Sequence, residues 1–176
     1  MSHPPEIFTL GVIRLRRPVP SDAEAIFEYG GDPEVARYAD WPVLTAMPSA
    51  ERIEGALARC DSGEEYRWMI LPNGSERPVG AISCFVEGHA AEFGFLINRS
   101  FWGKGYATEA ARAVAGWAMS QPSIWRLWAT CDCENQASVR VLEKAGLSRE
   151  GLLRRSKIRP NLSREPRDSY LYASVR

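Results

Sequence analysis

The order of predicted strands and helices in this chain indicates an α/β fold with a mixed sheet. First, the predicted strands come in groups, whereas a doubly wound parallel sheet alternates strictly between strand and helix. Second, an Asn73-Gly74 turn joins two strand-like segments, which is typical of an antiparallel hairpin because Asn-Gly favours positive φ. Third, two helical patterns, over 108–119 and 136–146, each follow a strand in the second half of the chain.

The N-terminal third predicts one strand and three helical pieces. A short strand lies within 12–17, and a proline-containing turn follows it. Ser21 or Asp22 is expected to cap the first helix. A second helical piece follows at 32–42, and Ser49 is expected to cap a longer third helix.

The remaining sequence predicts six strands and two helices. The strands are expected at 65–71, 77–86, 90–98, 125–131, 147–158 and 167–175. The run Phe-Gly-Phe-Leu-Ile at 93–97 suggests a strand buried on both faces. The helix from Thr108 is expected to pack Ala110, Ala113, Val114 and Trp117 against the sheet, with Glu109 and Arg112 facing water. The last helix is expected to end at Gly146.

Length and composition favour a single globular domain over residues 1–176, with no internal repeat, low-complexity tract or linker. The 22 Lys and Arg residues balance 22 Asp and Glu residues, so no basic excess points to nucleic acid. No stretch approaches the roughly 18 apolar residues of a membrane span, and the N-terminus lacks a signal-peptide pattern. We therefore expect a cytoplasmic protein without a nucleic-acid or membrane partner.

The four cysteines do not suggest a disulfide framework in a chain of this length, so reduced thiols are expected. Cys131 and Cys133 are separated by one residue, which is not a C-x-x-C spacing, and neither His3 nor His89 is near them in sequence. Since zinc sites need a regular ligand spacing, we expect no metal.

Two glycines flank a lysine in Trp102-Gly-Lys-Gly-Tyr-Ala-Thr108, directly before an alanine-rich helix. Unpaired N–H groups and the positive end of the helix dipole make such a position suitable for an anion. A Walker A loop is excluded, because Asn98 and Gly105 stand where it needs a glycine and a Ser or Thr. A Rossmann fingerprint fails at Thr108, where its third glycine belongs.

The loop resembles motif A of the GNAT superfamily of N-acetyltransferases, Q/R-x-x-G-x-G/A. Trp102 stands at the first position, Gly105 in the middle and Ala107 at the last, so the tryptophan departs from the motif. The segment 134–151, with the form N-x-x-S…LEKxG, resembles motif B of the same superfamily. Together with the order of the other segments, it is similar to the RimJ/RimL group of ribosomal-protein N-terminal acetyltransferases over about 13–175.

This resemblance implies a GNAT-like, mostly antiparallel sheet of about seven strands, flanked by helices and with splayed central strands. It also implies acetyl-CoA as cosubstrate, with its pyrophosphate on backbone amides between Gly103 and Thr108. Its pantetheine arm would lie in the gap between the strands. The expected acetyl-CoA-binding residues are Phe95, Leu96, Ile97, Trp102, Gly103, Lys104, Gly105, Tyr106, Ala107, Thr108 and Asn135.

Two residues are candidates for proton transfer. Glu92 alternates away from Phe93 and Phe95, and the resemblance implies that a carboxylate there takes the amine proton through water. The alternative is a solvated or salt-bridged glutamate. Many superfamily members use a tyrosine as the acid, but Leu142 stands at that position. Ser138 is therefore the candidate donor to the CoA sulfur, and the alternative is the N3 residue of a helix capped by Asn135.

The predicted function is transfer of acetyl from acetyl-CoA to a primary amine in a direct ternary complex. The acceptor is a protein N-terminus or a small-molecule amine such as a polyamine, an amino acid or an antibiotic, and the enzyme is a monomer or homodimer. The alternative is a catalytically idle acyl-CoA-binding or regulatory domain. Two further features keep two interpretations each. Three aromatic residues either line the acceptor side or belong to the core: Tyr38, Trp41 and Trp68. The basic run at 149–167 is either a charged sheet edge or a segment that attracts an anion.

Overall fold

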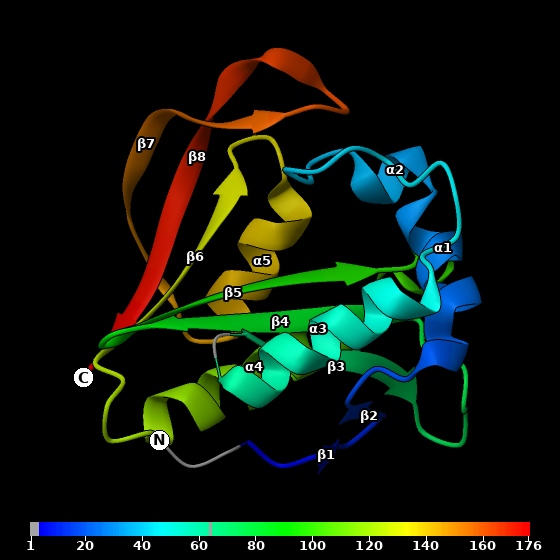
Figure 1. Ribbon diagram of the computed structural model, residues 1–176. Helices are drawn as coiled ribbons and strands as arrows, with labels where there is room; N and C mark the ends of the chain where they lie inside the picture. Colours follow the sequence, from blue (N-terminus) through cyan, green and yellow to red (C-terminus); the bar gives the residue numbers. More distant parts are fainter. Residues whose placement is uncertain (1–3, 64) are drawn as a thin grey trace.

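The computed structural model describes residues 4–63 and 65–176, which form one sheet with helices on both faces (Figure 1). The strands are β1 (Ile7–Thr9), β2 (Ile13–Arg16), β3 (Glu65–Pro72), β4 (Gly80–Glu87), β5 (Ala90–Ile97), β6 (Arg126–Asp132), β7 (Ser148–Arg159) and β8 (Ser163–Val175). The helices are α1 (Ala23–Gly30), α2 (Pro33–Ala36), α3 (Ala50–Ser62), α4 (Tyr106–Ser120) and α5 (Gln136–Lys144), with short 3-10 turns at Pro20–Asp22 and Arg99–Phe101.

The sheet has eight strands in the order β1-β2-β3-β4-β5-β6-β8-β7. Every neighbouring pair is antiparallel except β5 and β6, which are parallel. The predicted mixed, mostly antiparallel class is confirmed, with eight strands where about seven were expected. The unpredicted strand is β1, and its three residues are too few to show a period in the sequence.

The two parallel strands separate soon after they meet. They pair only at Ala90–Arg126, Ala91–Leu127 and Glu92–Trp128. Beyond that point β5 continues beside β4 alone, while β6 continues beside β8. Figure 1 shows the two strands diverging toward their C-terminal ends. The sheet is therefore splayed at its centre, as expected.

Helix α4 packs on one face of the sheet and forms the larger core. Trp117 lies edge-on to Tyr66 and Trp68 of β3, with ring centroids 5.0 and 5.7 Å away. The buried residues of the helix are Ala110, Ala111, Val114, Ala115, Trp117 and Ala118. This confirms the predicted face for Ala110, Val114 and Trp117, whereas Ala113 is only half-buried.

Glu109, expected to face water, is half-buried because its carboxylate accepts a hydrogen bond from the Val12 amide at 3.3 Å. The contact joins the first turn of α4 to β2. Arg112 is exposed as predicted. The helix itself begins at Tyr106, two residues before the predicted start.

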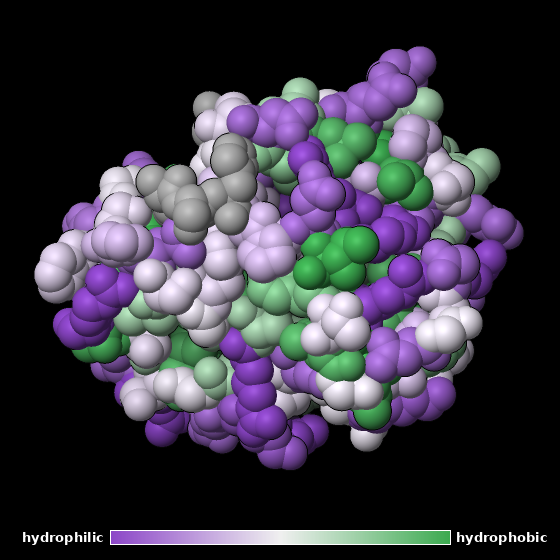
Figure 2. All heavy atoms as spheres, turned by 90° about the horizontal axis from the view of Figure 1, so that it is seen from below, coloured by the Kyte–Doolittle hydropathy of each residue, from purple (hydrophilic) through white to green (hydrophobic). Residues whose placement is uncertain are grey.

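The opposite face of β3 is covered by α1 and α2. Met69 and Leu71 pack there with Tyr29 and Val35, while Ile70 faces the larger core. Strand β3 is thus buried on both faces. The molecular surface, seen from below the view of Figure 1, carries small hydrophobic patches among hydrophilic side chains (Figure 2).

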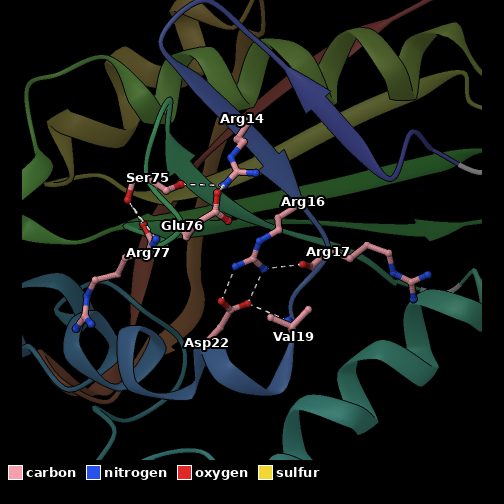
Figure 3. Close-up of polar contacts among 8 residues, drawn as sticks. All are labelled: Arg14, Arg16, Arg17, Val19, Asp22, Ser75, Glu76 and Arg77. Atoms are coloured by element: carbon pink, nitrogen blue, oxygen red, sulfur yellow. Dashed lines mark hydrogen bonds and ion pairs between the residues drawn. The ribbon is translucent and has the colours of Figure 1, made fainter.

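A buried ion pair orders the N-terminal turn. Arg16 donates to both carboxylate oxygens of Asp22 at 2.7 and 2.8 Å, and the Val19 amide donates to the same carboxylate at 2.8 Å (Figure 3). Asp22 is the N-cap residue of α1, but its side chain makes no capping hydrogen bond. The predicted N-cap position at Asp22 is therefore confirmed, but its side chain does not cap α1, because Arg16 and Val19 occupy the carboxylate.

Other predicted helix ends are confirmed. The Ser49 side chain accepts a hydrogen bond from the Arg52 amide at the start of α3. Helix α5 is followed by Gly146 at φ 95°, a left-handed conformation that favours glycine.

The predicted helical piece at 32–42 is only the single turn of α2. Among the described residues, no helix is long and apolar enough to cross a membrane.

The run at 93–97 corrects one prediction. Phe93 and Ile97 are buried, but Gly94 is exposed, and Phe95 and Leu96 are half-buried. Strand β5 is therefore not buried on both faces. The sheet splay, which the local sequence does not encode, leaves part of this strand open.

Candidate active site

The splay between β5 and β6 opens into a groove of about 1270 Å³. This exceeds the roughly 300–1000 Å³ of most small-molecule sites, so the groove has room for an extended ligand and a second molecule. Its walls come from β5, the glycine loop, the end of β6, the start of α5, the end of β7 and the segment around α2.

The glycine loop forms one end of the groove at the N-terminus of α4. Gly103 and Gly105 have φ values of 77° and 81°, and Gly105 is the N-cap residue of the helix. No atom lies within 4 Å of an added Cβ at either position, so backbone conformation is what requires the glycines. The first amides of a helix lack intrahelical partners, which makes them available to an anion.

Trp102 anchors the loop to the strand before it. Its indole Nε1 donates to the Ile97 carbonyl at 2.8 Å, while the side chain stays 51% exposed. The departure from the family pattern at this position thus has a structural role. Lys104 lies over the Phe101 ring, with its Nζ 4.6 Å from the ring centroid, and it does not line the groove.

The open edge of β5 forms one wall of the groove. Phe95, Leu96 and Ile97 all line it, as do Tyr106, Ala107, Thr108 and Asn135. Because β6 has turned away, no strand of the described residues lies beside 93–97 on that side. Backbone N–H and C=O groups that point away from β4 there can pair with an extended ligand.

Glu92 lies where the two strands separate, and its side chain is 31% exposed. Lys157 of β7 extends to it, with Nζ 3.4 Å from Oε1, and the same Nζ lies 3.5 Å from the Asp40 carboxylate. Glu92 therefore both lines the groove and takes part in an ion pair. The salt-bridged alternative therefore describes this residue, and its place on the groove leaves proton transfer as a prediction.

Asn135 and Ser138 lie on the opposite wall, at the start of α5. The Asn135 side chain accepts a hydrogen bond from the Ser138 amide at 3.1 Å, which is an N-cap. The Ser138 hydroxyl makes no hydrogen bond within the described residues, and the residue is half-buried on the groove. Leu142, in the place of the usual tyrosine, is buried.

Cysteine chemistry has little support in this groove. Burial raises the pKa of the Cys131 thiol to about 11, so it stays protonated near neutral pH. Burial also raises the pKa of Cys133. Within residues 4–63 and 65–176, no cluster of three metal-ligating side chains was found.

The end of the groove beside α2, where an acceptor is expected, contains two of the three aromatic residues named from the sequence. Tyr38 and Trp41 line it. Trp68 does not, because it is 1% exposed and packs in the core against Trp117 and Phe8. Of the two alternatives given for Trp68, its place in the core is confirmed, since strand β3 turns this residue toward α4.

The tip of the β7–β8 hairpin closes this end. Asn161 donates to the Ala36 and Trp41 carbonyls at 2.7 and 2.9 Å, and its side-chain oxygen accepts from the Val43 amide. In Figure 1 the orange-red hairpin and the segment after α2 approach each other at the top of the molecule. Sequence reasoning missed this closure, because the contacts join residues more than one hundred positions apart.

The basic run at 149–167 has more than one structural role. Arg167 donates to the buried Asp132 at 2.7 and 3.2 Å. Burial opposes ionisation of that carboxyl group, but the Arg167 hydrogen bonds, the Glu134 amide and the charges of Arg167 and Arg159 together outweigh it and lower the pKa of Asp132. Arg154 and Arg155 are exposed on the sheet edge, whereas Lys157 and Arg159 line the groove.

Comparison with known proteins agrees with this geometry. The family profile described as an acetyltransferase (GNAT) domain matches residues 13–148. YnaD of Bacillus subtilis, named as an uncharacterized N-acetyltransferase, is 31% identical over 156 residues, which cover 86% of each chain.

Two solved structures show how far the likeness extends. A GNAT-family acetyltransferase from Bacillus anthracis has a TM-score of 0.80 and 29% identity, over 96% of this chain and 98% of that one. The RimL acetyltransferase of ribosomal L7/L12, in complex with coenzyme A, has a TM-score of 0.84 over 97% of this chain and 98% of that one. At 21% identity, the second likeness concerns the fold alone.

Proposed function

This chain belongs to the GNAT acetyltransferase family, and on that premise we propose that it transfers acetyl from acetyl-CoA directly to a primary amine. The acceptor is a protein N-terminus or a small-molecule amine, bound together with acetyl-CoA in a ternary complex. We also propose that residues 1–176 act as one acetyltransferase domain. The four free cysteines are consistent with a reducing cytoplasm as its location.

One observation carries the proposal: a single groove joins the N-terminus of α4 to an unpaired strand edge. The amides from Gly103 to Thr108 are suited to the pyrophosphate, because they lie at the positive end of a fifteen-residue helix. The open space around both glycines leaves room for the phosphates to approach the backbone.

The strand edge is suited to the pantetheine arm. Bound acetyl-CoA supplies an activated thioester, and a backbone N–H in the 93–97 segment would polarise its carbonyl. Phe95, Leu96 and Ile97 supply this edge, and Asn135 faces it from the start of α5. Trp102 and Tyr106 hold the loop in place, Trp102 through the Ile97 carbonyl and Tyr106 by stacking on Phe101.

Proton transfer falls to two side chains on opposite walls. Glu92 would accept the proton of the incoming amine through water, and Lys157 would orient its carboxylate. Ser138 would donate its hydroxyl proton to the departing thiolate, since no hydrogen bond within the described part of the chain occupies that hydroxyl.

The test is acetyl-CoA consumption with a panel of amines and ribosomal-protein peptides, read as CoA thiol release. We expect release that depends on both the amine and the protein. A catalytically idle acyl-CoA-binding domain would instead bind acetyl-CoA, as seen by calorimetry, without releasing CoA above the buffer rate.

A further inference from the structure

Arg159 is a buried cation that makes no ion pair with any residue the structure describes. It ends β7, lines the acceptor end of the groove, and is only 5% exposed. Its Nε has no hydrogen-bond partner, and its guanidinium makes no ion pair with the described residues. An arginine keeps its charge in proteins, and the charge of Arg159 is one of the causes that lower the pKa of Asp132. No carboxylate of the described residues binds the guanidinium directly, so its hydrogen-bonding face stays available to a ligand.

Three carboxylates that line the groove with Arg159 bind other cations directly. Asp132 is held by Arg167 through two hydrogen bonds. Glu92 and Asp40 share the ammonium group of Lys157. Arg159 is therefore the one cation of this group that makes no ion pair with a described residue.

The surroundings hold Arg159 in position. The turn after it is closed by a hydrogen bond from the Leu162 amide to the Arg159 carbonyl at 2.9 Å. Asn161 fixes the same turn to the segment that carries Trp41. The guanidinium is thus placed before any ligand arrives, which lowers the ordering cost of binding.

A buried charge without a partner is expensive, and an anion that enters the groove would relieve that cost. The planar fork of arginine matches a carboxylate through two parallel hydrogen bonds. Arg159 stands two residues from Lys157 along β7, roughly 7 Å at the backbone. An anion there would lie one strand repeat away from the ion pair that includes Glu92.

Resting on the function proposed above, we propose that Arg159 binds a carboxylate of the acceptor. The acceptor is then a primary amine that carries a carboxylate within about an amino-acid length of the reacting nitrogen. The amine lies toward Glu92 and the carboxylate toward Arg159. A polyamine would place a second cation against Arg159, so this class is disfavoured.

The experiment compares matched acceptors that differ only in the carboxylate. The pairs are lysine against 1,5-diaminopentane, phenylalanine against phenethylamine, and a Ser-Glu peptide amide against its Ser-Gln counterpart. We expect at least one pair to show a kcat/KM about tenfold to a hundredfold higher for the carboxylate-bearing member. Arg159→Gln should remove this preference, and Arg159→Lys should retain part of it.

Arg154→Gln is the matched control, because Arg154 is exposed on the same strand. It should keep the parent's preference. Thermal unfolding of each variant shows whether a loss of activity reflects loss of the fold.

Three results would overturn the inference: equal kcat/KM within every pair, a preference for the diamine, or a carboxylate preference that Arg159→Gln leaves intact. No CoA release with any amine would count against the proposed function instead. Binding of the same pairs to the protein with CoA would then be measured by calorimetry, and equal affinities would again overturn the role of Arg159.

Discussion

Replacing Gly105 by valine tests the glycine loop as the phosphate-binding element. Gly105 caps α4 at φ 81°, where a β-branched residue is strained by about 1–2 kcal/mol. The valine side chain would also stand in the open space through which phosphates approach the amides. Losing one or two charge-assisted hydrogen bonds, each about 1.5–3 kcal/mol, corresponds to about tenfold weaker acetyl-CoA binding or more.

Two further variants separate backbone strain from blockage. Asparagine tolerates the left-handed region, so Gly105→Asn should unfold at nearly the same urea concentration as the parent while still binding acetyl-CoA more weakly. Gly116 lies exposed in the middle of α4 with nothing within 4 Å of an added Cβ. Gly116→Ala should therefore gain up to about 1 kcal/mol of stability and leave affinity unchanged.

Calorimetric titration of acetyl-CoA gives the affinities, and urea unfolding followed by tryptophan fluorescence gives the stabilities. If folded Gly105→Val binds acetyl-CoA within threefold of the parent, the pyrophosphate is not held on these amides.

The other predictions concern the core and the two proton-transfer candidates. Trp117→Ala should lower the free energy of unfolding in urea by about 3 kcal/mol. This is near the low end for a buried tryptophan, because the indole N–H that is removed is buried without a partner among the described residues. A loss below about 1 kcal/mol would mean that the helix face is misassigned. Ser138→Ala should lower kcat about a hundredfold or more with acetyl-CoA affinity nearly unchanged, and turnover within twofold of the parent would make the serine only a helix residue. Glu92→Gln should lower turnover and flatten the rise of rate with pH, because the amide cannot accept a proton; an unaltered pH–rate profile would leave Glu92 as a partner of Lys157 alone.

Local chemistry explains which parts of the fold could be predicted from the sequence. The Asn73-Gly74 hairpin, the Ser49 cap and the face of α4 that carries Trp117 depend on neighbours within a few residues, and all three are confirmed. Asp22 differs because Arg16 and Val19 compete for its carboxylate. Such competition depends on how β2 meets the turn, which a helix-capping pattern does not record.

The candidate site likewise has one part that local sequence predicts and another that depends on tertiary folding. The glycine loop is a contiguous motif, so its position at the start of α4 could be predicted. The roles of Lys157 and Arg159 depend on how the β7–β8 hairpin folds over the groove, and the sequence showed only a basic run. The sequence left Trp68 open between the acceptor side and the core, and the register of β3 decides for the core.

A single-turnover reaction with isotope-labelled acetyl-CoA tests the central claim most directly. The protein is mixed with labelled acetyl-CoA, with and without an amine from the acceptor panel, and the amine and the intact protein are analysed by mass spectrometry. Direct transfer in a ternary complex predicts one labelled acetyl group on the amine for each CoA released, and an unlabelled protein in every sample. Label on Cys131 or another side chain, or acetyl-CoA that binds and stays intact with every amine, would contradict the account.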